Sequence, residues 1–197
     1  IIDGTTSRGF PLASLPYVKE YMFVKKGMLP ASMETILDKI MDESGTILFS
    51  TLPEEVLLKS SNSKMYYILA KKYFSEDNLD KALMYLGKID SKSTIYPFAL
   101  HLLGVISSLK NNESEARNYY SKCVEYNDKK YVDNKNYCQL AMARSFFNEK
   151  KYLEAQNSYN ETSKKSSVWP EQLYEEAWNQ YYLKNIELNN VKANIYR

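Results

Sequence analysis

The chain has 197 residues, of which 44% are hydrophobic and 25% are charged, and its formal net charge is +2 at pH 7. The longest apolar stretch, from Phe98 to Leu109, contains a histidine and two serines and is too short to cross a bilayer, so we expect no transmembrane segment. The nearly balanced charge, without a recognition motif, argues against nucleic acid as a partner. Six glycines and six prolines, mainly at expected helix ends, favour an all-α chain of about eleven helices.

Residues 1–62 are expected to form an N-terminal helical region. Capping residues and stop signals indicate helices over residues 15–26 and 33–44. Residues 51–54, with the sequence Thr-Leu-Pro-Glu, have the form of a capping box for a third helix. We interpret this region as degenerate repeats or as a cap for the residues that follow.

From residue 63 onwards, residues of similar size return at fixed intervals. Within each of three sets, the residue number increases by 34 and then by 39. The sets are Ala70, Gly104 and Ala143; Ala82, Ala116 and Ala155; and Leu86, Tyr120 and Tyr159. Polar turns over residues 75–78, 110–112 and 148–151 separate the first set from the second. Each unit is therefore predicted to be a helical hairpin, in which small residues at the crossing let the two helices approach to about 8 Å.

The predicted units begin near residues 63, 97, 136 and 170. The five extra residues of the second interval fall in the polar stretch 127–135, where we expect them to lengthen a loop or extend the helix ends. The fourth unit has Ala177 at the expected offset but Asn189 at the second small position. It is therefore expected to be degenerate, truncated or a terminal cap.

This period, with small residues at the helix crossings, resembles the tetratricopeptide repeat (TPR) family. The resemblance implies a right-handed α-solenoid of antiparallel hairpins over residues 63–197 and a non-enzymatic role as a protein-binding adaptor. The segment Trp169–Trp178 is also similar to exported bacterial members of the family. That similarity favours a periplasmic or envelope-associated location, with the cytoplasm as the alternative.

In this family, four positions of each first helix line a concave groove that binds a peptide or a partner protein. The residues at those positions in this chain are Lys64, Tyr67, Lys71 and Phe74, then Phe98, His101, Val105 and Ser108, then Tyr137, Leu140, Arg144 and Phe147, and finally Glu171, Tyr174, Trp178 and Tyr181. Such an aromatic and basic groove suits a ligand with apolar anchors and some acidic character. The alternative is that several of these rings pack against neighbouring units.

The resemblance also bears on one known ligand class, a C-terminal carboxylate, and on one alternative role, that of a structural subunit. Members that clamp a C-terminal carboxylate carry Lys, Asn and Arg at five positions, where this chain has Tyr67, Lys71, Leu102, Tyr137 and Ala141. Only Lys71 is cationic, so that ligand is not expected. The alternative to an adaptor is a structural subunit of a bacterial envelope, motility or secretion complex.

Catalysis and metal binding are not expected. His101 is the single histidine of the chain, so no two-histidine metal motif can form, and no glycine-rich phosphate loop is present. An enzyme, the third possibility, would depend on His101, and no cofactor is implied. The two cysteines, Cys123 and Cys138, lie in neighbouring hairpins; we favour buried free thiols, with a disulfide as the alternative.

Overall fold

A computed structural model describes residues 49–59, 62–126 and 129–195, with side chains as far as residue 186. This part of the chain is all-α, as predicted, with eight α-helices and no strand. The count differs from the expected eleven or so, and the helices predicted over residues 15–26 and 33–44 lie outside the described residues. None of the described helices combines the length and the apolar character that a bilayer span requires.

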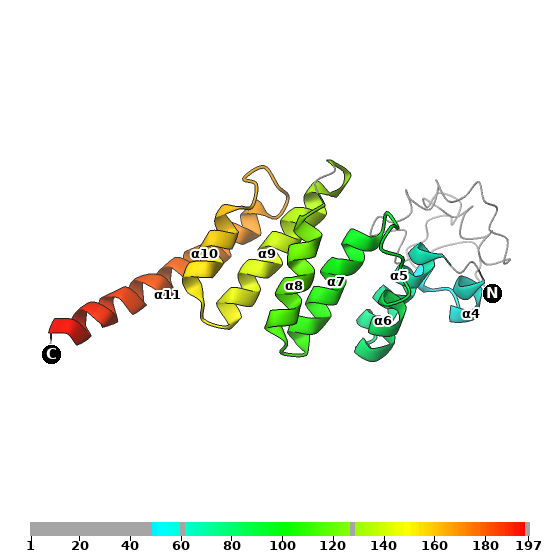
Figure 1. The fold of residues 1–197 in the computed structure, drawn as a ribbon, viewed down its shortest axis with the longest axis horizontal. Helices are drawn as coiled ribbons and strands as arrows, with labels where there is room; N and C mark the ends of the chain where they lie inside the picture. The colour runs from blue at the N-terminus through cyan, green and yellow to red at the C-terminus, as the bar shows by residue number, and fades with distance from the viewer. Residues whose placement is uncertain (1–48, 60–61, 127–128, 196–197) are drawn as a thin grey trace, which may run out of the picture. The chain divides into compact units, whose positions relative to one another are not determined.

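The chain divides into two compact units, Ile1–Ile95 and Tyr96–Arg197. The described helices of the first unit are α4 (Glu54–Leu58), α5 (Ser63–Ser75) and α6 (Leu79–Leu86) (Figure 1). Those of the second unit are α7 (Tyr96–Leu109), α8 (Glu113–Val124), α9 (Val132–Asn148), α10 (Tyr152–Asn160) and α11 (Trp169–Ile195), with a 3₁₀ turn over Lys129–Tyr131. Helices that follow one another within a unit pack together, α5 on α6 and α7 through α11 in succession.

The three predicted hairpin turns share one backbone geometry. Asp77, Asn111 and Lys150 occupy the same place in each turn, and their φ angles of 57°, 60° and 61° lie in the left-handed region. The residue after each donates its N–H to the carbonyl oxygen five positions earlier, over 2.8–2.9 Å. This is the Schellman closure of a helix C-terminus, so the sequence interval corresponds to a repeated structural unit.

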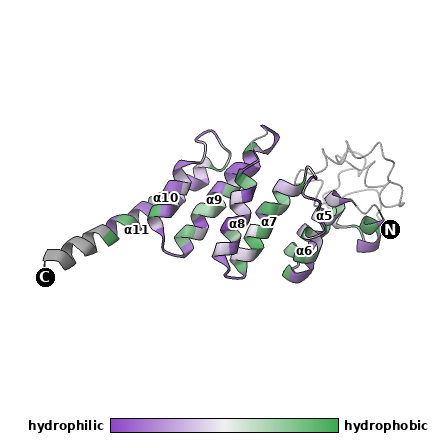
Figure 2. Ribbon diagram, viewed as in Figure 1, coloured by the Kyte–Doolittle hydropathy of each residue, from purple (hydrophilic) through white to green (hydrophobic). Residues whose placement is uncertain are grey.

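The small residues of the period are buried where the paired helices meet. Ala70, Ala82, Ala116, Ala143 and Ala155 have no exposed surface. At Gly104, a Cβ atom would lie 2.3 Å from the Tyr120 ring, which packs directly over the α7 backbone. A larger residue at Gly104 would therefore clash. Figure 2 shows α7 as the most consistently hydrophobic helix of the second unit, in keeping with its close packing against Tyr120.

The five-residue insertion extends a helix. α9 begins at Val132, about one turn before the point at which the period predicts, and the 3₁₀ turn Lys129–Tyr131 precedes it. The added turn contains buried Asn134, whose side-chain amide donates to the Pro97 carbonyl oxygen at 3.0 Å and to Cys123 Sγ at 3.2 Å. The insertion thereby ties α9 to both α7 and α8.

Cys123 and Cys138 form a disulfide between α8 and α9, with their Cα atoms 6.3 Å apart. The favoured prediction of two free thiols is therefore wrong. Cys123 lies near the end of α8 and Cys138 in the second turn of α9, so the alternative that the sequence left open is the one formed. The bridge lies in a buried cluster with Leu100, Ala116 and Tyr120.

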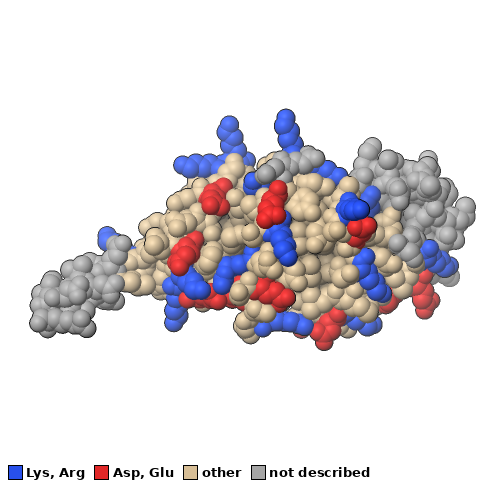
Figure 3. Space-filling view, viewed as in Figure 1, with Lys and Arg blue, Asp and Glu red and all other residues tan. Residues whose placement is uncertain are grey.

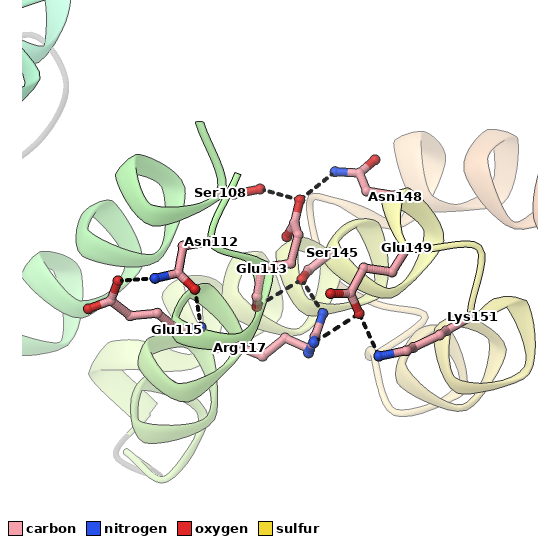
Figure 4. Close-up of polar contacts among 9 residues, drawn as sticks. All are labelled: Ser108, Asn112, Glu113, Glu115, Arg117, Ser145, Asn148, Glu149 and Lys151. Carbon is pink, nitrogen blue, oxygen red and sulfur yellow. Dashed lines mark hydrogen bonds and ion pairs between the residues drawn. The ribbon is translucent and has the colours of Figure 1, made fainter. Parts of the chain in front are cut away.

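Polar side chains join the α7–α8 turn to the α9–α10 turn (Figure 4). The Glu113 carboxylate on α8 accepts hydrogen bonds from Ser108 at 2.9 Å and from Asn148, the last residue of α9, at 3.0 Å. Arg117, one turn further along α8, pairs with Glu149 at 3.0 Å. Because these contacts join adjacent hairpins, they fix how the α9–α10 hairpin packs against the α7–α8 hairpin.

In the first unit, tyrosines hold α4 against α5 and α6. The Glu54 carboxylate accepts hydrogen bonds from the hydroxyls of Tyr73 and Tyr85, whose rings stack with centroids 5.8 Å apart. These bonds lower the pKa of Glu54. The predicted capping box is not formed, since the N-cap of α4 is Pro53 and makes no side-chain cap bond. The Glu54 side chain is bound to the tyrosines instead.

Candidate protein-interaction surface

The predicted groove residues of the first unit are mostly enclosed. Lys64 is buried, and Tyr67, Lys71 and Phe74 are half-buried along α5. Burial raises the pKa of the Tyr67 hydroxyl. This part of the predicted lining exposes little aromatic surface.

The predicted residues on α7 pack against aromatic neighbours of the second unit. Phe98 meets Tyr131 edge-to-face with centroids 5.9 Å apart. His101 lies between Tyr120 and Tyr137, at centroid distances of 6.1 and 6.2 Å. Burial, with a smaller contribution from the charge of Arg144, lowers the pKa of His101 to about 4, so the imidazole is neutral near pH 7. Val105, the remaining α7 position, is also half-buried and packs on the core.

Leu140 on α9 is not a surface residue. Its side chain is completely buried in a cluster with Ala143, Ala155, Tyr159 and Val168. Leu140 precedes Ala143 by three positions and therefore shares its core-facing side of α9. The assignment of Leu140 to the groove lining is wrong.

Arg144 is held by two acidic residues of α11. Its guanidinium forms a two-pronged contact with Glu175, at 2.6 Å from Nη2 and 2.9 Å from Nε, and lies 2.7 Å from Glu171. One positive charge thus faces two negative ones, so the basic character that we expected here is absent. On the face drawn in Figure 3, acidic and basic side chains are interspersed and neither sign forms a continuous patch.

The exposed members of the predicted lining are concentrated on α11. Tyr174 is 68% exposed, and Trp178 and Tyr181 are about half exposed, as is Tyr137 on α9. Exposure increases from α7 to α11 because each earlier helix is covered by the next, whereas no described helix follows α11.

A cavity of about 370 Å³ opens beside Trp178. Its lining residues are Arg144, Phe147, Asn148, Tyr159, Glu175 and Trp178. The Arg144–Glu175 pair provides its polar wall, and Tyr159 donates a hydrogen bond of 3.3 Å to Glu175. Phe147 and Trp178 provide apolar wall, so the cavity combines a fixed charge pair with aromatic surface.

Two aromatic residues next to this cavity were missed by sequence reasoning. Tyr182 lies 5.2 Å from Tyr152 in a stacked pair, and both rings meet Phe147 edge-to-face. Tyr182 follows Trp178 by one helical turn, and this spacing could have identified it. The contact with Tyr152 of α10 depends on packing between helices and left no local signal.

α11 buries polar side chains and exposes apolar ones. Gln172 and Asn179 have no exposed surface, and their amides donate to the carbonyl oxygens of Tyr159 at 2.7 Å and Tyr152 at 2.9 Å. The side-chain oxygens of both residues are buried without a hydrogen-bond partner. Leu173, in contrast, is 48% exposed. A helix with this distribution has an uncovered apolar face.

Comparison with protein-family models, with curated proteins and with solved structures found no match for the chain. Within the described residues, no three His, Cys, Asp or Glu side chains lie close enough to hold a metal ion. The function is therefore inferred from the exposed side chains, cavities and charges of the second unit.

Proposed function

We propose that the chain is a non-enzymatic protein-protein interaction module and that the aromatic cavity between α9 and α11 binds a side chain of a peptide or partner protein. The observation that carries this proposal is the cavity of about 370 Å³ flanked by exposed aromatic residues. Aromatic residues supply a large contact area at a small cost in side-chain entropy, and they are frequent among residues that dominate binding energy.

The charges at the cavity favour a ligand that is apolar with a neighbouring cation. Arg144 already has two carboxylate partners, and the side chain of Glu171 is 60% exposed. A Lys or Arg of the ligand could pair with Glu171 while stacking on Trp178 or Tyr174. This preference replaces the acidic ligand that we expected on the assumption that Arg144 was unpaired.

Selection from a phage-displayed library of random peptides, with the full chain immobilised, tests this proposal. We expect enrichment of peptides with an aromatic or aliphatic anchor next to Lys or Arg, and Trp178→Ala should weaken the best peptide by at least ~10-fold. In a Trp169→Phe background, Trp178 is the only tryptophan, so its fluorescence should report binding. Trp169→Phe by itself serves as the matched control. Equal affinity for Trp178→Ala would contradict the proposal.

We also infer that the three hairpins are units of a right-handed, TPR-like α-solenoid. The identical left-handed turns at Asp77, Asn111 and Lys150 and the buried small residues support this inference. Small-angle scattering of the full chain distinguishes an extended arrangement of stacked hairpins from a compact bundle, which would contradict it.

The disulfide supports an oxidising compartment as the location of the protein. A bridge such as Cys123–Cys138 persists outside the reducing cytosol. Thiol alkylation of the protein in freshly lysed source cells, followed by mass measurement, should find both cysteines protected. Full alkylation without a reductant would instead favour a cytosolic location.

A further inference from the structure

Among the described residues, no helix covers the face of α11 that corresponds to the buried face of α5, α7 and α9. The period places Leu173 at the position of Leu100, and Ala177 at the position of Gly104 and Ala143. Leu100, Gly104 and Ala143 are buried, whereas Leu173 and Ala177 are exposed. The next position on this face, Gln180, is also exposed.

These open positions line a groove between α10 and α11. Its volume is about 600 Å³, and Leu173, Ala177 and Gln180 form its wall on α11. Tyr159 on α10 and Thr162 in the following loop contribute to the opposite side. The groove therefore lies where a second helix of a fourth hairpin would pack.

The adjoining part of α11 does not supply that helix. In the three hairpins the chain turns at residues 76–78, 110–112 and 149–151. The period places the corresponding turn at residues 183–185, but α11 continues through them without interruption as far as Ile195. The described part of α11, up to Ile195, therefore does not fold back to fill the groove.

The earlier hairpins specify the chemistry of such a helix. Each second helix has a fully buried alanine, followed four residues later by a larger side chain that is almost completely buried. These pairs are Ala82 with Leu86, Ala116 with Tyr120, and Ala155 with Tyr159. The groove carries one charged residue of each sign, Lys164 and Glu176, and so gives no preference for a strongly charged partner.

We propose that α11 receives an amphipathic helix of a partner protein, which packs against Leu173, Ala177 and Gln180 as α6, α8 and α10 pack within the chain. The partner helix carries Ala or Gly at its crossing with Ala177 and Leu or Tyr one turn later. This inference rests on the proposed protein-binding function but uses a different flank of α11 from the aromatic cavity. The two surfaces can therefore be tested separately.

A synthetic peptide with the sequence of α6 and its caps, residues 78–90, is a suitable probe because it carries Ala82 and Leu86 in this arrangement. Fluorescence anisotropy of the labelled peptide with the full chain should show saturable binding, with a dissociation constant of roughly 100 µM. Ala177→Arg should weaken binding by at least ~10-fold, and so should the peptide with Ala82→Glu. Trp178→Ala, which alters the cavity, should change the affinity by less than about 2-fold.

Three results would overturn the inference. The first is absence of saturation at about 1 mM peptide, and the second is equal binding to wild type and Ala177→Arg. The third is a dimeric chain in light scattering that Ala177→Arg makes monomeric, because the groove would then be occupied by a second copy. Leu173→Lys provides a second disruptive variant, and circular dichroism checks that each variant keeps its helicity. Loss of peptide binding in Trp178→Ala alone would support the cavity proposal while overturning this one.

Discussion

Within the second unit, the contact between α8 and α9 contains a buried apolar cluster with a disulfide, whereas the contact between α10 and α11 contains buried side-chain amides. Tyr120 and the Cys123–Cys138 bridge lie in the first contact, and Gln172 and Asn179 lie in the second. Hydrophobic burial stabilises the first region, but buried amides add only a modest net stabilisation and cost free energy where an oxygen stays unpaired. The unit thus separates a stable core from an edge whose apolar side chains face outwards.

Of the changes proposed here, loss of the disulfide between α8 and α9 should lower the free energy of unfolding the most. Its cysteines are 15 residues apart, so the Cys123→Ser/Cys138→Ser variant should lower the free energy of unfolding by about 3 kcal/mol. Urea unfolding followed by circular dichroism measures this loss. Wild type in dithiothreitol is the matched control and should lose a similar amount. A smaller loss than about 0.5 kcal/mol would mean that apolar packing alone holds α8 and α9 together.

Substitutions at equivalent positions compare the two regions directly. Gly104→Ala places a methyl group against the Tyr120 ring and should destabilise the chain by roughly 1–3 kcal/mol. Ala177→Leu at the matching place on exposed α11 should change stability by less than about 0.5 kcal/mol. Thermal or urea unfolding of both variants tests this contrast. Similar losses would indicate that α11 is covered in the free protein.

Acidification should weaken the α7–α9 region through His101. Its pKa is about 4 in the folded chain and about 6.5 in the unfolded chain, so the unfolded state binds the proton more tightly. The stabilisation is complete well above pH 6.5 and should fall by roughly 2 kcal/mol by about pH 5, and further towards pH 4. His101→Gln removes the titrating group, and the pH dependence of its unfolding free energy should be correspondingly smaller. Identical pH profiles would contradict the burial of His101.

The hairpins were predictable because their signals are local. Turn residues, helix caps and the interval between small side chains place Ala70, Ala82 and the turns correctly. Features that depend on contacts between hairpins were not predictable in the same way. The Cys123–Cys138 bridge joins α8 to α9, and the Asn134 side chain joins α9 to both α7 and α8.

The candidate site shows the same division between local and tertiary information. The period assigned Trp178 and Arg144 to one lining, and the structure places both at the cavity; whether they bind a ligand stays a prediction. The charge of Arg144 could not be assessed without its partners Glu171 and Glu175. Charged residues in a sequence pattern therefore indicate where a site lies better than they indicate what it prefers to bind.

The smallest expected effect concerns the left-handed residues of two turns, Lys150 between α9 and α10 and Asn111 between α7 and α8. Lys150 adopts a φ of 61°, and a lysine in the left-handed region costs about 1 kcal/mol relative to the usual conformation. Lys150→Gly should therefore raise the free energy of unfolding by about 0.5–1 kcal/mol, after the greater entropy of glycine in the unfolded chain has offset part of the gain. Asn111→Gly in the α7–α8 turn should gain less, because asparagine tolerates this conformation better than lysine does. Parallel urea titrations of the two variants would measure the difference between their gains in unfolding free energy. A loss of stability in Lys150→Gly would show that the lysine side chain makes a contact that outweighs the backbone strain.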